Sequence, residues 1–379
     1  MGKWLKDFCQ IFYCWLKNNY FLVIVLILYF FVYSSGIKHF PPANTDESWI
    51  GEAAKMLFNS SRPDLTMFGG KIDLALFPSY TIALGLFFKL FGVGLVQGRI
   101  FSVFFGAIAI IFLYLIAKKL YHQRIAYLAI IFFVINPFIL LNRIIRPELF
   151  VVALSLGALY FYLIGKNKNL NYFFSGILIA IACIGHPHAG FILLTILSLF
   201  IFDFGWRFFL KKDFIYFFSG ILLILISFFI FFIFKIKIYD RYGQSPEYLR
   251  DRLIFFKWDK IKSSLFGECN RWAIHCGQGK IKAQRWLNLG AIKYLWITGL
   301  GYLLVTFKNH RVLLSSIFFV VFGLTIIDSR KYFEYLILAV PFLSLALAIL
   351  FDRLSEFIKS EIKIDKLNLI KNKIFYYCA

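Results

Sequence analysis

Long apolar runs alternate with short polar segments along this chain. Runs of about 16–22 apolar residues are long enough to cross the hydrocarbon core of a membrane as helices, and ten such runs occur. They lie at residues 20–37, 98–117, 125–142, 148–165, 171–186, 189–205, 214–234, 287–306, 312–328 and 333–351. This pattern predicts an all-α, polytopic integral membrane protein with about ten transmembrane helices.

The composition agrees with this prediction. Of the 379 residues, 60% are hydrophobic and 16% are charged, and the mean hydropathy is +0.75. Soluble domains usually carry about 25% charged residues. The formal net charge is +22, but the basic residues lie in short loops and at the two tails. That distribution is typical of cytoplasmic loops and argues against nucleic acid as a partner.

The basic residues also give the chain an orientation. When the N-terminus is placed inside, the cytoplasmic loops are rich in Lys and Arg, and both termini are cytoplasmic. The short outer loops then carry Arg143, Arg146, Arg330 and Lys331. No small-x-small cleavage site follows the first run, which favours a retained signal anchor. We expect a multi-pass protein of the bacterial inner membrane.

The same topology sets the organisation of the chain. A cytoplasmic tail is expected at 1–19, a transmembrane domain at 20–353 and a basic cytoplasmic tail at 354–379. Residues 38–97 form a first long outer segment, in which 49–58 have the apolar spacing of a helix lying flat at the interface. Residues 77–92 form a second, partly apolar piece that we expect to pack at the same surface.

A second long outer segment, 236–286, is polar and rich in Trp and Arg. It holds Cys269 and Cys276, the two of the six cysteines that are placed to pair. A disulfide would require that this segment face an oxidising compartment, and the sequence leaves that open. Because loops on a rigid scaffold usually carry specificity, we expect this segment to shape the acceptor entrance.

Two adjacent acids, Asp46 and Glu47, follow the first apolar run in "NTDESWIGEAAKML" (44–57). One interpretation is structural: Asn44 and Glu47 form a capping-box pattern, and Asp46 in the first turn suits the helix dipole. The other is functional, because carboxylates beside a membrane are costly to desolvate. These residues alone do not decide between the two.

Three further polar groups lie at the outer ends of spans, in "NRIIRPEL" (142–149), "GHPHAG" (185–190) and "DSRKYFEYLILAVP" (328–341). Each has a structural explanation by itself: a surface ion pair, inert interfacial histidines, or an aromatic belt with snorkelling cations. Together, however, they gather ionisable groups at one face while the span interiors nearly lack them. This distribution favours an enzyme acting on an anionic lipid over a transporter, which would place its ionisable groups near the midplane.

The order of these motifs resembles the GT-C membrane glycosyltransferases, and within them the protein O-mannosyltransferase and lipid A aminoarabinose transferase group. The resemblance covers residues 40–165 and rests on the acidic pair, the "FGVGLVQGRI" run (91–100) and the Arg-Pro-Glu loop. A weaker similarity is found at 328–345. It implies a sugar donor on a polyprenyl phosphate and transfer outside the cytoplasm. The acceptor would be a lipid, a glycan or a protein.

The resemblance also implies roles for individual residues. Asp46 matches the acid that engages the acceptor or acts as a base, and Glu148 matches the acid of the second outer loop. We therefore expect Asp46 and Glu148 to be catalytic. The residues expected to bind substrate are Glu47, Arg143, Arg146, His186, His188, Arg330, Lys331, Tyr332 and Tyr335. No cofactor is certain; a divalent cation is left open, with Asp46, Glu148, His186 and His188 as candidate ligands.

Some positions depart from the aminoarabinose transferases. Trp49 and "LFPS" (76–79) stand where those enzymes tend to have an arginine and a Lys-Pro-Pro run, and the His186–His188 pair replaces a frequent Lys-Gly. The donor-phosphate contacts therefore cannot simply be carried over to this chain, and these departures argue against the aminoarabinose activity in particular.

The reaction itself explains the residue types. Displacing a polyprenyl phosphate from an anomeric carbon passes through an oxocarbenium-like state, and cations stabilise the departing phosphate. A hydroxyl acceptor needs a carboxylate base such as Asp46, whereas an anionic acceptor needs none. Two alternatives remain: a flippase of lipid-linked sugars, and an acyl- or phospho-transferring enzyme, for which the "HPH" motif supplies too few groups.

Overall fold

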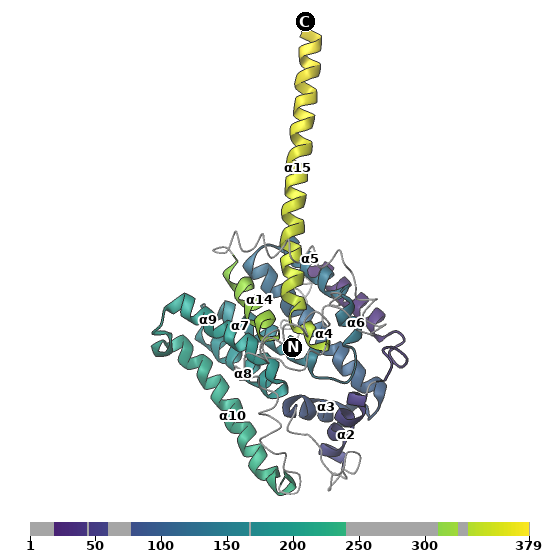
Figure 1. Ribbon diagram of the computed structural model, residues 1–379, viewed down its shortest axis with the longest axis vertical. Coiled ribbons are helices and arrows are strands. Elements are labelled where there is room, and N and C mark those ends of the chain that lie inside the picture. The colour runs from purple at the N-terminus through teal and green to yellow at the C-terminus, as the bar shows by residue number, and fades with distance from the viewer. Residues whose placement is uncertain are drawn as a thin grey trace, which may run out of the picture.

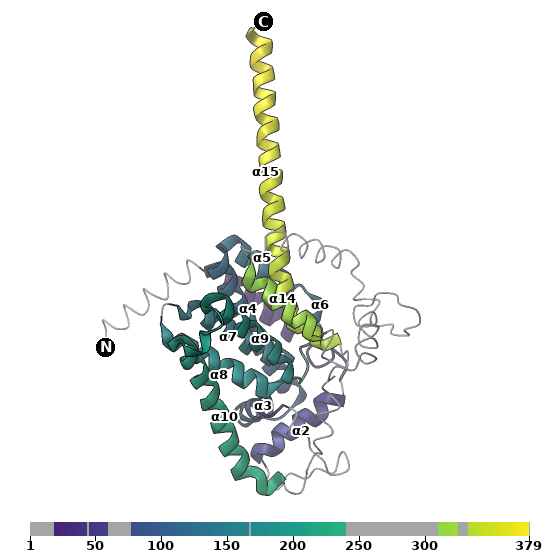
Figure 2. The ribbon, with the colours of Figure 1, turned by 60° about the vertical axis from the view of Figure 1, so that its left-hand side comes forward.

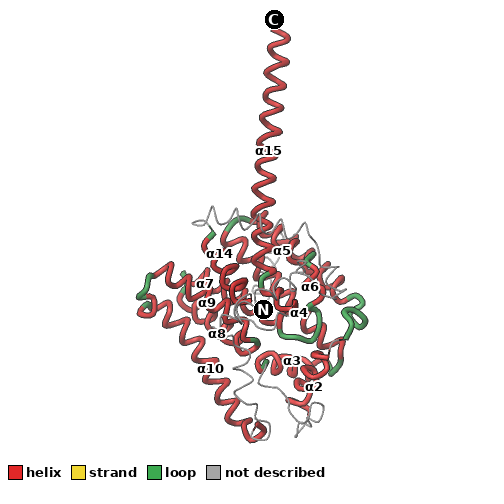
Figure 3. Tube along the Cα trace, in the orientation of Figure 1, coloured by secondary structure: helices red, strands yellow, loops and turns green. Residues whose placement is uncertain are grey.

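In a computed structural model, the chain is helical over the part that the structure describes, which is residues 19–43, 45–59, 77–166, 168–239, 310–324 and 333–378 (Figures 1 and 3). No strand occurs among these residues. The predicted all-α class is therefore confirmed. The predicted span 287–306 and most of the outer segment 236–286, with Cys269 and Cys276, lie outside the described residues.

The described helices are the following, in chain order. After a first helix, Asn19–Ser34, come α2 (Thr45–Asn59), α3 (Pro78–Phe91), α4 (Leu95–Leu120), α5 (Gln123–Val134), α6 (Pro137–Leu141), α7 (Glu148–Gly165) and α8 (Asn169–Gly185). They continue with η2 (Pro187–Ala189), α9 (Gly190–Phe204), η3 (Phe208–Leu210), α10 (Lys212–Tyr239), α14 (Arg311–Phe322), η7 (Phe333–Leu338) and α15 (Val340–Cys378).

Four segments in the described part are long and apolar enough to cross a membrane: Leu95–Leu120, Glu148–Gly165, Pro187–Phe204 and Lys212–Phe231. Five shorter apolar helices accompany them: Asn19–Ser34, Pro78–Phe91, Gln123–Val134, Asn169–Gly185 and Arg311–Phe322. These helices are those of an integral membrane protein. Residues 49–58 fall within α2 as predicted, and residues 77–92 form α3, which packs against α2.

The core of the bundle lies around α4 and α7, which pack against each other, with α5 against α4 and α8 against α7. Helix α10 packs on α8 at the edge of the bundle (Figures 1 and 2). Two glycines allow this close contact: a Cβ added to Gly176 would lie 2.0 Å from the Phe217 carbonyl oxygen, and one added to Gly220 would lie 2.2 Å from that of Phe173. Small residues at such contacts let membrane helices approach closely.

Two predicted spans are interrupted in the structure. The span predicted at 125–142 is divided into α5 and α6, because Pro137 opens α6 and the Asn136 side chain caps it by accepting a hydrogen bond from the Phe138 N–H at 3.0 Å. The span predicted at 333–351 begins with the 3₁₀ helix η7, and the α-helix starts only at Val340. The predicted tail boundary at 353/354 falls inside α15, which projects from the body of the protein (Figure 1).

Helices α4 and α7 both begin at one end of the bundle and finish at the other. At 1.5 Å per residue, the 26-residue α4 is about 39 Å long and the 18-residue α7 about 27 Å. The end where they begin, with Arg99 and Glu148, is called the outer end after the orientation that the sequence predicts. The opposite end, with Lys118 and Lys119, is called the basic end, and α15 is attached there through the ion pairs of Asp352 with His122 and Arg124.

Candidate active site

A buried ion pair joins the first outer segment to α4. Arg99 donates from Nε to Glu47 Oε1 at 2.8 Å and from Nη2 to Glu47 Oε2 at 2.6 Å. Its Nη1 donates to the carbonyl oxygens of Ile37 and Pro41, both at 2.8 Å. Arg99 is 0% exposed and Glu47 3% exposed. Because a buried charge must be paired, Arg99 holds Ile37, Pro41 and Glu47 in one position over the start of α4.

The loop at 143–147 is fixed by the same group of residues. The Ile145 N–H donates to Glu47 Oε1 at 2.9 Å, and Ser102 Oγ donates to the Ile144 carbonyl oxygen at 2.6 Å. Gly98 makes room for this loop, since a Cβ added there would lie 2.5 Å from the Ile145 side chain. The Gly-Arg pair of the "FGVGLVQGRI" run therefore positions both outer loops against α4.

Arg143 has a comparable place on the other side of the loop. Its Nη1 donates to the carbonyl oxygens of Tyr33 and Ser35, at 2.8 and 2.9 Å, and its guanidinium lies over the Phe40 ring. Burial, together with the charge of Arg99, lowers the pKa of Arg143 from its ordinary value. Arg143 Nε is buried and makes no hydrogen bond within the part of the chain that the structure describes.

Arg146 lies at the centre of three carboxylates from three different elements. It donates from Nη1 to Asp46 Oδ2 at 2.8 Å and from Nε to Glu148 Oε1 at 2.9 Å, and Nη1 is 3.6 Å from Glu334 Oε1. Its guanidinium carbon lies 5.8 Å from the centre of the Tyr335 ring. The Arg–Glu pair that the sequence allowed as a weak surface contact is thus a buried network that joins α2, α7 and η7.

The three carboxylates differ in their exposure to solvent. The Asp46 side chain is 37% exposed, whereas those of Glu148 and Glu334 are 2% and 8% exposed. Glu148 Oε2 and Glu334 Oε2 are buried without a hydrogen bond among the described residues. Asp46 is therefore the carboxylate of this group that a molecule from solution can reach most readily.

Burial and mutual attraction both act on the charges of this network. Burial on its own lowers the pKa of Arg146, but the neighbouring Glu148, Glu334, Tyr335 and Asp46 outweigh it and hold that pKa above its ordinary value. Glu334 lies in η7, before the apolar helix α15 begins. Its burial raises the pKa of its carboxyl above the usual range, against the opposing effect of Arg146.

A run of stacked rings connects Asp46 with Arg146 by a second route. Trp49 Nε1 donates to Asp46 Oδ1 at 3.3 Å, and the Trp49 ring is stacked on Phe77. Phe77 in turn is stacked on His186, with 5.0 Å between ring centres. His186 and His188 both contact Tyr335, at 5.2 and 4.3 Å between ring centres. The structure thus brings "HPH", the acidic pair and the start of the last helix into one site.

Some predicted site residues are not described by the structure, and the candidate metal ligands are not grouped around one point among the described residues. Arg330, Lys331, Tyr332 and the proposed N-cap Asn44 lie outside the described residues. Among the residues that the structure describes, no three His, Cys, Asp or Glu side chains are grouped so as to hold a metal ion. The Arg146 guanidinium, rather than an open coordination site, lies between Asp46 and Glu148.

Two residues of the site were missed by the sequence analysis. Arg99 lies in the "FGVGLVQGRI" run, and that motif by itself predicts no partner for it. A lone arginine flanked by apolar residues in a membrane helix is a signal of its own, because such a charge must find a buried partner. Glu334 lies in "DSRKYFEYLILAVP", where its basic and aromatic neighbours give no sign that its carboxyl belongs to the site.

Comparison with known proteins agrees with this geometry. Residues 74–232, less than half of the chain, match the family of dolichyl-phosphate-mannose-protein mannosyltransferases. The fold is similar to that of ArnT from Cupriavidus metallidurans bound to undecaprenyl phosphate, with a TM-score of 0.61 and 15% identity over 89% of this chain and 60% of ArnT. The chain has the fold of a GT-C membrane glycosyltransferase.

A second GT-C enzyme has a similar fold. The archaeal oligosaccharyltransferase AglB from Archaeoglobus fulgidus, in complex with an inhibitory peptide and a dolichol-phosphate, matches with a TM-score of 0.56 and 13% identity over 92% of this chain and 52% of AglB. The chain therefore spans about 60% of the length of ArnT and about half that of AglB. Among curated protein sequences, none matches this chain. The GT-C resemblance found in the motifs is confirmed at the level of the fold.

Proposed function

We propose that this chain is a membrane glycosyltransferase that moves a sugar from a polyprenyl-phosphate donor to a lipid, glycan or protein acceptor. The observation that carries this proposal is the network in which Arg146 binds Asp46, Glu148 and Glu334 at the outer end of a GT-C fold. The proposed location is a bacterial inner membrane, with both termini in the cytoplasm and the site outside, as the positive-inside rule predicts.

Asp46 is the proposed base. It is the most exposed carboxylate of the network, and Arg146 and Trp49 hold one of its oxygens each. A carboxylate held in this way can accept the proton of an acceptor hydroxyl as that oxygen attacks the anomeric carbon. If the acceptor is itself anionic, Asp46 orients it and takes no proton.

Glu148 and Glu334 act through Arg146 in this proposal. Both are nearly covered, and each places Oε1 toward the guanidinium. The prediction that Glu148 is catalytic stays a prediction, and its burial favours a positioning role. The Oε2 atoms of both residues are buried and make no hydrogen bond in the described part of the chain.

The donor class is supported by the relatives. ArnT was solved with undecaprenyl phosphate and AglB with a dolichol-phosphate, both of which are polyprenyl-type phosphates. A departing phosphate requires cations near it, and Arg143, Arg330 and Lys331 are the proposed sources.

The transporter alternative has less support. A carrier of lipid-linked sugars would place ionisable side chains along a pathway near the middle of the membrane. Here the outer carboxylates and arginines lie at the beginnings of α2, α4, α7 and η7. The family match and the two folds described above are those of sugar-transferring enzymes.

The proposal is tested on the purified full-length protein in detergent. Mass spectrometry of the co-purified lipids should reveal a polyprenyl-phosphate sugar, and incubation with that lipid and an extract of envelope acceptors should release the free polyprenyl phosphate. Asp46→Asn should lower this release by about a hundredfold. Glu52→Gln is the matched control, because Glu52 lies on the same helix in an exposed pair with Lys55. Full release by Asp46→Asn would contradict the assigned base.

A further inference from the structure

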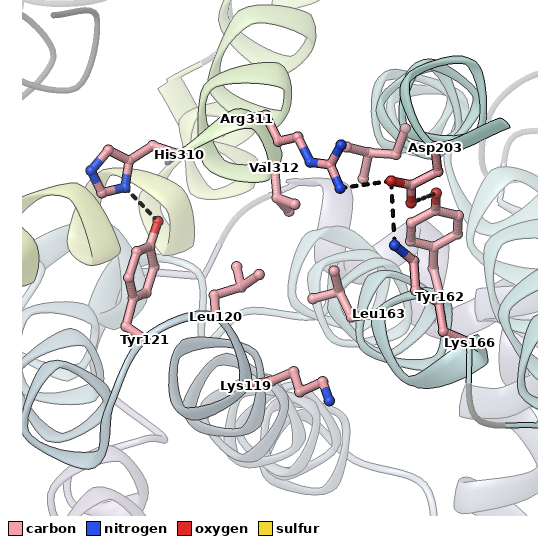
Figure 4. Close-up of a pocket in the computed structure, with 11 residues that line it drawn as sticks. Lys119, Leu120, Tyr121, Tyr162, Leu163, Lys166, Asp203, His310, Arg311 and Val312 are labelled. Atoms are coloured by element: carbon pink, nitrogen blue, oxygen red, sulfur yellow. Dashed lines mark hydrogen bonds and ion pairs between the residues drawn. The ribbon is translucent and has the colours of Figure 1, made fainter. Parts of the chain in front are cut away.

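A cavity of about 330 Å³ lies at the basic end of the bundle. Figure 4 shows the residues that line it. The cavity is formed by the last turns of α4, α7 and α9 and by the start of α14. Since α4 and α7 begin at the outer end and finish here, the cavity is separated from Arg146 by the length of these helices. Neither the family match nor the compared folds assign a role to it.

Basic side chains outnumber acidic ones among the residues that line this cavity. Lys119, Lys166 and Arg311 line it together with one acid, Asp203, which leaves a surplus of two positive charges (three minus one) among these lining residues. His310 also lines it, and burial together with Arg353 lowers the pKa of its ring, so His310 adds no charge near neutral pH. The cavity therefore attracts anions.

Asp203 shows that the donors around the cavity converge on a single anion. Its Oδ1 accepts from Arg311 Nη2 at 2.6 Å and lies 3.4 Å from Lys166 Nζ, while Oδ2 accepts from the Tyr162 hydroxyl at 2.9 Å. An arginine has five N–H donors and a lysine three, so within the part of the chain that the structure describes these contacts leave most of the donors of Arg311 and Lys166 unused. Both side chains are well exposed, at 42% and 58%.

The walls of the cavity are mixed in character. Leu120, Leu163 and Val312 lie between the Asp203 group and the hydrogen-bonded pair of Tyr121 and His310 (Figure 4). An apolar wall beneath a rim of cations suits a headgroup whose hydrocarbon chain continues into the membrane. A soluble anion would make no use of that wall.

We propose that this cavity binds a phosphate group, carried by an anionic phospholipid of the leaflet at the basic end. Lys119, Lys166 and Arg311 bind the phosphate oxygens, and the leucines contact the upper part of the acyl chains. Asp203 holds Lys166 and Arg311 in place and at the same time weakens binding by its own negative charge. The site is independent of the proposed sugar transfer, which takes place at the other end of the bundle.

The test uses the full-length protein in nanodiscs of phosphatidylcholine and phosphatidylglycerol, with native mass spectrometry of the lipids it retains. The wild type should retain phosphatidylglycerol in preference to phosphatidylcholine. The double variant Lys119→Gln/Lys166→Gln should lose about tenfold in this preference. Lys211→Gln/Lys212→Gln is the matched control, because it removes two exposed lysines at the same end that do not line the cavity, and it should retain the preference.

Asp203→Asn should change the retention of phosphatidylglycerol in the opposite direction to the double lysine variant. It keeps the shape of the side chain but removes the competing charge, so it should strengthen retention of phosphatidylglycerol several-fold. A purely structural cluster would lose thermal stability in this variant without any gain in lipid binding. This single variant also keeps the proposal testable if the double lysine variant does not fold.

A second experiment distinguishes a phospholipid from free inorganic phosphate as the ligand of the cavity. If inorganic phosphate raises the melting temperature of the wild type in neutral detergent, and phosphatidylglycerol does not compete with it, the cavity takes a soluble phosphate instead of a lipid. Equal losses in the two double lysine variants would overturn the proposal, since general surface charge would then explain the binding. The proposal would also be overturned if the wild type showed no preference for phosphatidylglycerol and no change in melting temperature with phosphate.

Discussion

Asp46 and Glu47 are neighbours in the chain, yet each forms an ion pair with a different arginine. Glu47 binds Arg99 through two hydrogen bonds in the protein interior, and Asp46 binds Arg146 at the edge of the site. The two acids that the sequence presented as a single motif therefore have separate tasks. Glu47 fixes the first outer segment to the bundle, and this contact places Asp46 where a substrate can reach it.

The first prediction concerns this buried pair. Glu47→Ala leaves the Arg99 guanidinium buried with no carboxylate, and it should lower the free energy of unfolding by about 3–5 kcal/mol. Glu52→Ala on the same helix removes only the exposed partner of Lys55 and should change it by less than about 1 kcal/mol. Unfolding in mixed micelles measures both. Similar losses in the two variants would contradict the structural role of Glu47.

The second prediction concerns the close approach of α4 to the second outer loop. Gly98→Ala places a methyl group where the Ile145 side chain lies, so it should destabilise the protein by about 1–3 kcal/mol. Ile145→Ala removes the atoms that clash. Gly98→Ala/Ile145→Ala should therefore be more stable than the sum of the two single changes predicts, as a double-mutant cycle would show. Simple additivity would mean that the two residues do not contact each other.

The third prediction concerns the geometry that Arg146 imposes. Arg146→Lys keeps the positive charge, but an ammonium group cannot serve three carboxylates with the same fork of donors. The rate of sugar release should fall by about a hundredfold. Arg353→Lys is the control, because Arg353 is exposed and pairs only with Glu356 among the described residues. A normal rate for Arg146→Lys would show that charge alone is sufficient at this position.

The fourth prediction separates the orientation of Asp46 from its chemistry. Trp49→Phe removes the Nε1 donor to Asp46 and keeps a ring that can stack on Phe77. It should reduce turnover by about threefold to tenfold, as expected for one hydrogen bond, with little change in stability. Turnover and melting temperature are measured on the same preparation. If both fall together, the indole has a packing role rather than an orienting one.

The fifth prediction follows from the raised pKa of Glu334. Between the pKa of the unfolded chain and the higher pKa of the folded protein, the folded state keeps a proton that the unfolded state has lost. Stability from this group is present below the unfolded glutamate pKa of about 4.3, and it is lost as the pH rises through the folded value. The melting temperature of Glu334→Gln relative to wild type should therefore increase with pH in this window. Parallel curves would contradict the raised pKa.

Much of the fold was predictable because membrane helices follow the lengths of apolar runs. The span predicted at 148–165 coincides with α7, and the one at 171–186 nearly coincides with α8. The interruptions were harder to predict, since they depend on local capping and not on hydropathy. Asn136 and Pro137 divide one apolar run into two helices, and η7 precedes the start of α15.

The sequence predicted several residues of the site, but it did not predict which residues they contact. The sequence placed Asp46, Arg146 and Glu148 at one end, because topology alone brings loops of one face together. It did not show that Glu47 turns inward to Arg99, because that contact joins residues 52 positions apart. Glu334 was missed for a similar reason: its importance comes from burial beside Arg146, which composition does not reveal.

The covered position of Arg99 and Glu47 also bears on how the protein can be handled. Dissolved salt weakens the attraction between charges that face water, but it has little effect on charges enclosed by protein. The outer end should accordingly keep its shape when the protein is extracted and washed in concentrated brine. The contact between Arg311 and Asp203, where the arginine is open to water, should loosen in the same buffer.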